Sequence, residues 1–144
     1  MGLAIAENLE GPYVQLPVPI TKNDRIIEDG YAFFYKGKFY LMTTDNHGMI
    51  ERGGGLLWSS DDGINFNEPV KAFSLIKEYL QEKKLPENYT FHYGGTRGKF
   101  ERPQLLLNED GLPEYLYAPS GTNIFGGDAT VSYVLKINYS KTTR

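Results

Sequence analysis

Two short segments of this 144-residue chain contain the residue types that acid–base chemistry requires. Glu28 and Asp29 open one apolar run, and Glu101 and Arg102 open another, with Glu28 and Glu101 lying 73 residues apart. Paired carboxyl groups can work on the two sides of a glycosidic bond, one as proton donor and the other as base or nucleophile. Such groups act only where the fold brings them together, so the pattern of elements decides whether they can.

Short strand-like runs separated by turn residues follow the first acidic segment. Runs rich in β-branched, aromatic and aliphatic residues alternate with Lys36-Gly37 and Asp61-Asp62-Gly63, which are typical of tight turns. Four antiparallel strands within about fifty residues make one blade of a propeller. The four predicted strands are Ile27–Tyr35, Lys38–Thr44, Leu56–Ser59 and Ile64–Phe73.

The second acidic segment begins a repeat of this pattern. Glu114–Tyr117 parallels Phe39–Met42, and Gly126-Gly127 precedes an apolar run much as Gly54-Gly55 does. The sequence therefore predicts an all-β fold, an incomplete propeller of about two and a half four-stranded antiparallel blades. The predicted parts are an outer hairpin of a preceding blade (1–20), a complete blade (24–75), a helix and loop insertion (76–98) and the last blade (99–144).

One short surface helix is predicted between the two blades. Leu75, Ile76, Tyr79 and Leu80 recur at helical spacing, and Ser74 is a suitable N-cap for a helix over 74–84.

Composition excludes several classes of function. The net charge of -3 comes from mixed signs and leaves no basic stripe for nucleic acid. With no cysteine there is neither a disulfide framework nor a thiolate metal site. No apolar run approaches the ~20 residues of a membrane span, and the first residues do not form a signal peptide. The compartment stays open.

The hairpin sequences resemble a known group of enzymes. Ile27–Phe33 followed by Gly37–Leu41 resembles the inner hairpins of five-bladed glycosidases such as families 43, 32 and 117, and Phe100–Leu106 is similar to a later blade. The resemblance covers nearly the whole chain and implies the C-terminal portion of a five-bladed propeller. It also allows a periplasmic or extracellular parent enzyme.

The resemblance implies roles for two carboxyl groups. Glu101 matches the general acid, and Asp29 matches the acidic residue that orients or tunes it. The sequence departs from the family-43 pattern at two positions. That pattern has proline after the acidic residue where this chain has Gly30 after Asp29, and its acid motif has glycine where this chain has Arg102 after Glu101.

Further residues are candidates for sugar binding. Arg102 has a forked set of donors, and the loop histidines His47 and His92 can donate to hydroxyl groups or a leaving oxygen. The remaining predicted substrate-binding residues are Glu28 and Asp45. The alternative interpretation of the two acidic segments is that they form ion pairs between neighbouring blades. The alternative interpretation of His92 is a solvated position on the surface.

Two motifs favour structural roles. Ser59–Phe66 resembles the Asp-box of propellers, in which we expect Asp61 to accept turn N–H bonds, Gly63 to take a positive φ and Phe66 to pack. Glu10-Gly11-Pro12 has the same residues as the Glu-Gly-Pro acid motif of family 43. It follows a predicted strand, however, and this position favours an outer turn.

The leading functional prediction is a glycosidase that acts on the end of an oligosaccharide or polysaccharide in an axial pocket. The alternatives are a glycoside phosphorylase and a non-catalytic carbohydrate-binding or structural propeller fragment. We expect no cofactor and assign no metal ligands, and a structural divalent cation at the propeller axis is left open. Because an incomplete ring leaves sheet edges uncovered, we expect a homo-oligomer or a fragment of a longer chain.

Overall fold

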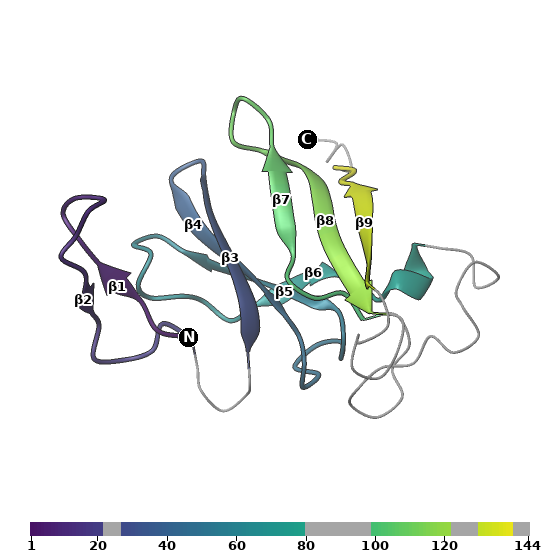
Figure 1. The fold of residues 1–144 in the computed structure, drawn as a ribbon, viewed down its shortest axis with the longest axis horizontal. Helices are drawn as coiled ribbons and strands as arrows, with labels where there is room; N and C mark the ends of the chain where they lie inside the picture. The colour runs from purple at the N-terminus through teal and green to yellow at the C-terminus, as the bar shows by residue number, and fades with distance from the viewer. Residues whose placement is uncertain (22–26, 80–98, 122–129, 140–144) are drawn as a thin grey trace.

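The computed structural model describes residues 1–21, 27–79, 99–121 and 130–139. It contains three antiparallel sheets, of two, four and three strands, and none of them closes on itself (Figure 1). In each sheet the strands are neighbours in chain order. The predicted all-β class is confirmed, and the arrangement is consistent with a partial propeller. Within those ranges no helix has the length and apolar character that crossing a membrane requires.

The first sheet is a small hairpin of β1 (Ala4–Ile5) and β2 (Val14–Gln15). Gly11, with φ of 84°, donates its N–H to the carbonyl of Asn8 and closes the connection. Glu10-Gly11-Pro12 thus lies between the two strands, where the sequence favoured an outer turn.

The second sheet consists of β3 (Glu28–Tyr35), β4 (Lys38–Thr44), β5 (Gly55–Ser60) and β6 (Val70–Phe73). Lys36 and Gly37 both have positive φ, 47° and 78°, which is the geometry of the two-residue turns that join twisted hairpins. The fourth strand is shorter than the predicted Ile64–Phe73. A turn occupies the residues just after β5, and Pro69 lacks an N–H for the ladder.

The third sheet consists of β7 (Gln104–Leu107), β8 (Pro113–Gly121) and β9 (Thr130–Lys136). The side chain of Asn108 accepts from the N–H groups of Asp110 and Leu112 and shapes the turn between β7 and β8. Gly111 in that turn has φ of 78°. These three strands lie within residues 99–144, the range predicted for the last blade.

The predicted helix over 74–84 is, among the described residues, one 3-10 turn at Ile76–Glu78. Ser74 is not its cap: Leu75 holds that position without a side-chain hydrogen bond, and Ser74 instead donates its N–H to the hydroxyl of Tyr79. Leu75 and Ile76 are both buried, so tertiary packing accounts for the apolar spacing that suggested a longer helix.

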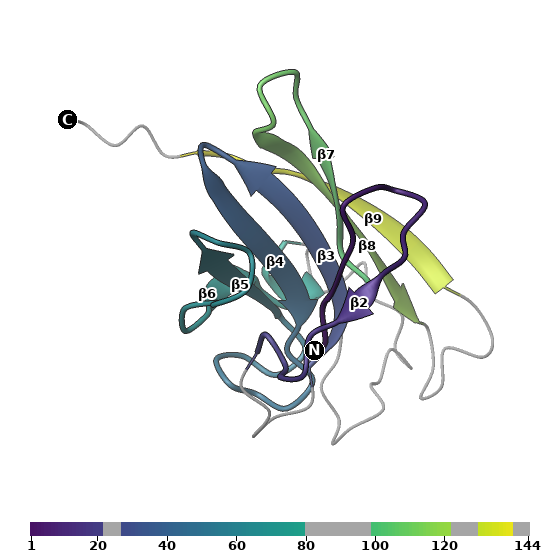
Figure 2. The same cartoon turned by 90° about the vertical axis from the view of Figure 1, so that its left-hand side faces the viewer.

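The sheets follow one another across the molecule, with the second sheet in the middle (Figures 1 and 2). One face of the second sheet packs through Leu41, Leu56 and Trp58 on residues of the N-terminal segment. The opposite face packs on the third sheet. The buried residues of that larger cluster are Met42, Phe73, Ile76, Phe100, Leu116 and Ala118.

Phe100 is central to the packing between the second and third sheets. Its side chain is completely buried, and its ring meets those of Phe73 and Tyr133 edge to face, with centroids 6.0 and 5.7 Å apart. Burial of one such ring stabilises a fold by about 2–3 kcal/mol. The segment just before β7 is therefore fixed against the second sheet.

Candidate functional site

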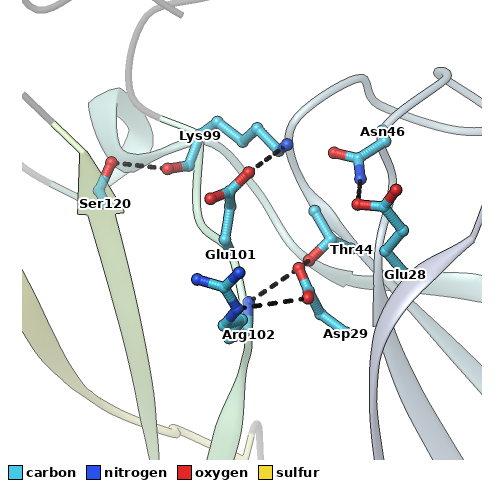
Figure 3. A network of polar contacts seen from close by, with 8 residues as sticks. All are labelled: Glu28, Asp29, Thr44, Asn46, Lys99, Glu101, Arg102 and Ser120. Atoms are coloured by element: carbon cyan, nitrogen blue, oxygen red, sulfur yellow. Dashed lines mark hydrogen bonds and ion pairs between the residues drawn. The ribbon is translucent and has the colours of Figure 1, made fainter. Parts of the chain in front are cut away.

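The two acidic segments meet where β3 and β7 begin (Figure 3). Glu28 and Asp29 open β3, whereas Glu101 and Arg102 lie just before β7. The hydroxyl of Tyr31 donates to the carbonyl of Leu105 at 3.2 Å and joins the two strands directly. We call this group of side chains the inner edge; it consists of Glu28, Asp29, Thr44, Asn46, Lys99, Glu101, Arg102 and Ser120.

Both segments contain the same backbone irregularity. Asp29 and Arg102 are residues with positive φ, 59° and 44°, a conformation that non-glycine residues rarely adopt. The register of β3 against β4 also shifts between Glu28 and Tyr31, as in a β-bulge. Asp29 and Arg102 are 73 residues apart, the spacing of the repeat, so the repeat extends to the backbone conformation. A bulge of this kind re-aims a side chain.

Asp29 joins the two sheets. One carboxylate oxygen accepts from the Thr44 hydroxyl at 3.2 Å and from the Arg102 N–H at 3.3 Å, and the other lies 3.7 Å from Nε of Arg102. The Asp29 side chain is 16% exposed and that of Arg102 is 76% exposed. This is an ion pair between neighbouring sheets that leaves most of the guanidinium donors facing solvent.

Glu28 is exposed and accepts a hydrogen bond from the amide nitrogen of Asn46 at 2.9 Å. Asn46 itself is buried, and its amide oxygen has no hydrogen-bond partner among the described residues. Among the described residues, this oxygen is therefore an open acceptor in the network.

Glu101 is paired with a lysine that is far more buried than itself. The ammonium of Lys99 lies 2.5 Å from Oε1 of Glu101, with side chains 8% and 36% exposed respectively. The backbone of both residues is held on β8: Ser120 donates its hydroxyl to the Lys99 carbonyl at 2.6 Å, and the Glu101 N–H donates to the Pro119 carbonyl at 3.1 Å. Glu101 is thus fixed at the inner edge from two sides.

Close packing around Lys99 explains why the nearby position 53 is a glycine. Gly53 has φ of 86°, and a Cβ built there would lie 2.8 Å from Cδ2 of Leu75 and 3.3 Å from Cβ of Lys99. A larger residue at this position would push on the lysine stem.

Asp45 organises the loop that follows β4. Its buried carboxylate accepts four backbone N–H bonds, from residues 48–51, at 2.7–2.9 Å. His47 lies exposed in this loop, next to the inner-edge residue Asn46. Direct sugar contacts by Asp45 and His47 stay predictions, and His92 lies outside the described residues.

The Asp-box turn is separate from the inner edge, and one assignment within it was wrong. Asp62, not Asp61, accepts the turn N–H bonds, from Ile64 and Asn65 at 2.8 and 2.7 Å. Asp61 instead pairs with Lys38, the first residue of β4, which lies opposite Tyr35 at the far end of β3 from Glu28. The other two expectations hold, since Gly63 has φ of 75° and Phe66 packs against the cluster around Trp58.

Sequence reasoning missed Lys99, Thr44 and Asn46. For Lys99 a signal existed, because residues two apart in an extended segment project to the same side, which pairs Lys99 with Glu101. For Asn46 a signal also existed, because the predicted hairpin of Ile27–Tyr35 with Lys38–Thr44 brings the residues that follow Thr44 beside Glu28. Within the described ranges no group of three or more His, Cys, Asp or Glu side chains is arranged to hold a metal ion.

Comparison with known proteins gives one informative match. The chain is 30% identical, over 148 aligned residues and 98% of its length, to extracellular endo-alpha-(1->5)-L-arabinanase 2 of Bacillus subtilis (strain 168). The match supports a glycoside hydrolase-like relationship. The chain spans 28% of the length of that relative. No family model matches the chain, and no solved structure matches it significantly.

Proposed function

We propose that this chain forms part of a glycosidase whose reaction takes place at the inner edge. The observation that carries the proposal is the meeting of repeat-equivalent acidic segments from two neighbouring sheets, joined by the contact of Asp29 with Arg102. The similarity to an arabinanase supports a glycan as the substrate class and arabinan as the first substrate to test.

In this proposal Glu101 is the proton donor to the leaving oxygen. Asp29 orients the site through Thr44 and Arg102, and its low exposure keeps it in place. The exposed guanidinium of Arg102 and the exposed ring of His47 are free on their solvent side to donate to sugar hydroxyls. A second carboxylate is needed on the opposite face of the sugar, and Glu28 or a residue of another blade takes that role.

A non-catalytic sugar-binding or structural role is the second candidate, and one observation favours it. Each central carboxylate already has a cationic partner, Arg102 for Asp29 and Lys99 for Glu101. Ion pairs of this kind can serve only to join neighbouring sheets. Under this alternative, loss of a carboxylate changes stability or binding, and no turnover exists to be lost.

The test uses the full-length protein with Glu101→Gln and, as a matched control, Glu109→Gln in the exposed turn after β7. On arabinan oligosaccharides, Glu101→Gln should lower kcat by about 10²- to 10⁴-fold, because glutamine cannot supply a proton. An aryl arabinoside with an activated leaving group should be largely spared, and Glu109→Gln should match the parent on both.

Equal loss on both substrates would show that Glu101 is not the proton donor. Sugar binding without hydrolysis of any glycan by the parent protein would favour the second candidate.

A further inference from the structure

Glu28 and Glu101 occupy equivalent positions in neighbouring sheets. They are separated by the spacing of the repeat, and each comes directly before a residue with positive φ, Asp29 or Arg102. Those two residues are in contact, since the Arg102 N–H donates to Oδ2 of Asp29 at 3.3 Å. In Figure 3 both glutamate carboxyl groups lie on the same side of this contact. The fold thus presents two carboxyl groups of equivalent origin to one side of the inner edge.

The bulge in β3 determines where Glu28 projects. Glu28 lies opposite Thr44 on β4, and Tyr31 lies opposite Met42, so β3 advances by three residues where β4 advances by two. An extra residue in one strand reverses the side to which the side chain before it points. Glu28 is exposed, whereas the side chain of Asp29 is 16% exposed and is turned into the contact between the sheets.

Glu28 has a carboxylate oxygen available for chemistry, and Asp29 has none. Both oxygens of Asp29 face donors, from Thr44 and Arg102. Within the described ranges the carboxylate of Glu28 accepts from the amide nitrogen of Asn46, which reaches Oε2 at 2.9 Å. Its Oε1 is left for a water molecule.

Asn46 is well placed to fix the direction of Glu28, because the chain is held on both sides of it. Asn46 itself is 7% exposed. The preceding residue, Asp45, donates its N–H to the Gly54 carbonyl at 2.8 Å. The carboxylate of Asp45 accepts from the N–H groups of residues 48–51, which follow. A buried amide on a fixed loop can therefore hold an exposed carboxylate in one direction.

We propose that Glu28 is the base of the glycosidase reaction and that Asn46 is its positioning residue. Glu28 removes a proton from a water molecule on the face of the sugar opposite the leaving group. The water oxygen bonds to the anomeric carbon as the glycosidic bond breaks, and Glu101 gives its proton to the leaving oxygen. The exposure of Glu28 gives that water access. The inference rests on the proposed function and narrows it, because the second carboxylate then belongs to this chain and not to another blade.

The experiment uses the full-length protein with Glu28→Ala and, as a matched control, Glu114→Ala, which changes an exposed glutamate in β8. Glu28→Ala should lower kcat by about 10²- to 10⁴-fold with little change in KM, and Glu114→Ala should match the parent. Unlike the loss in Glu101→Gln, this loss should extend to the activated aryl arabinoside, because a good leaving group does not replace a base.

Sodium azide gives a second measurement on Glu28→Ala. Azide is a nucleophile that needs no base, so it should restore turnover of the aryl arabinoside and give a glycosyl azide of inverted anomeric configuration, which NMR identifies. Retained kcat in Glu28→Ala, no azide product, or an azide product of retained configuration overturns the inference.

A double-mutant cycle tests Asn46. Asn46→Ala should lower kcat in the parent but have little further effect in Glu28→Ala, because it acts through Glu28. An equal effect of Asn46→Ala in both backgrounds would overturn its positioning role.

The two proposals can fail separately. If Glu101→Gln behaves as expected while Glu28→Ala keeps the parent kcat, the proposed function stands and the base belongs to another blade. If the parent protein hydrolyses no glycan, the proposed function and this inference both fail.

Discussion

Two ion pairs of almost equal length, Lys38–Asp61 and Lys99–Glu101, lie in very different surroundings. The first is at the outer end of the β3–β4 hairpin with both side chains exposed, and the second is at the inner edge with a buried lysine. An exposed pair contributes little, because solvent screens it and can replace either partner. The comparison shows that residue types and distances alone do not identify a site that can do chemistry.

The two regions also differ in how far apart in the sequence their contacting residues lie. At the outer turn, Asp62 accepts from residues two and three positions further on, so the turn is organised within itself. At the inner edge, Asp29 contacts Arg102, 73 residues away, and both have positive φ. Residues held in sparsely populated backbone conformations by the surrounding structure cluster at functional sites.

The largest difference in stability should be between the variants Asp45→Ala and Asp61→Ala. Asp45→Ala leaves the backbone N–H groups of residues 48–51 without their buried acceptor, and we expect the free energy of unfolding to fall by about 3 kcal/mol. Asp61→Ala removes only an exposed ion pair and should be close to neutral. Chemical denaturation measures both, and equal effects would remove the distinction between the two regions.

A smaller effect on stability should appear at Arg102, where two variants separate the contribution of backbone strain from that of sugar binding. Arg102→Gly and Arg102→Ala both remove the guanidinium, but only glycine adopts the φ of 44° without strain. The glycine variant should therefore be more stable by about 1 kcal/mol. Both should raise KM for arabinan oligosaccharides by about tenfold.

Equal stability of the two Arg102 variants would show that the backbone relaxes at that position. An unchanged KM in both would remove Arg102 from the proposed sugar site.

The smallest effect concerns the outer turn and pH. Hydrogen bonds from Asn65, first from its backbone N–H and then from its side chain, hold the pKa of Asp62 well below its ordinary value of 3.8. A lowered pKa means that this stabilisation is present above that value and is lost as the pH falls through it toward the folded value. Asp62→Asn should therefore lose stability less steeply than the parent from about pH 4 to about pH 2.

Asn65→Ala is the graded control for that measurement, because it keeps the backbone donor and should keep most of the pH dependence. A parent-like slope in Asp62→Asn would assign the acid sensitivity of the fold to other groups.

Much of the fold could be predicted from local pattern. The turn pair Lys36-Gly37 and the repeat between the segments of Glu28 and Glu101 depend on strand period and turn chemistry, which the sequence displays directly. The helix over 74–84 was predicted from apolar spacing, and burial of Leu75 and Ile76 explains that spacing without a longer helix.

The details of the candidate site could not be predicted in the same way. The acidic residues were evident from their types, but the positive φ of Asp29 breaks the alternation that their directions were inferred from. The burial of Lys99 depends on Phe100 packing between two sheets, and the open acceptor of Asn46 depends on the loop that Asp45 holds. Both are products of tertiary contacts.

The most direct test of the central claim is a crystal structure of the full-length Glu101→Gln variant with an arabinan oligosaccharide. The account predicts a sugar at the inner edge, with a glycosidic oxygen within about 2.6–3.2 Å of the side chain at position 101 and a hydroxyl bonded to Arg102. A sugar bound at the outer turn near Asp61 and Asp62, or an inner edge that stays empty in crystals that bind sugar elsewhere, would contradict it.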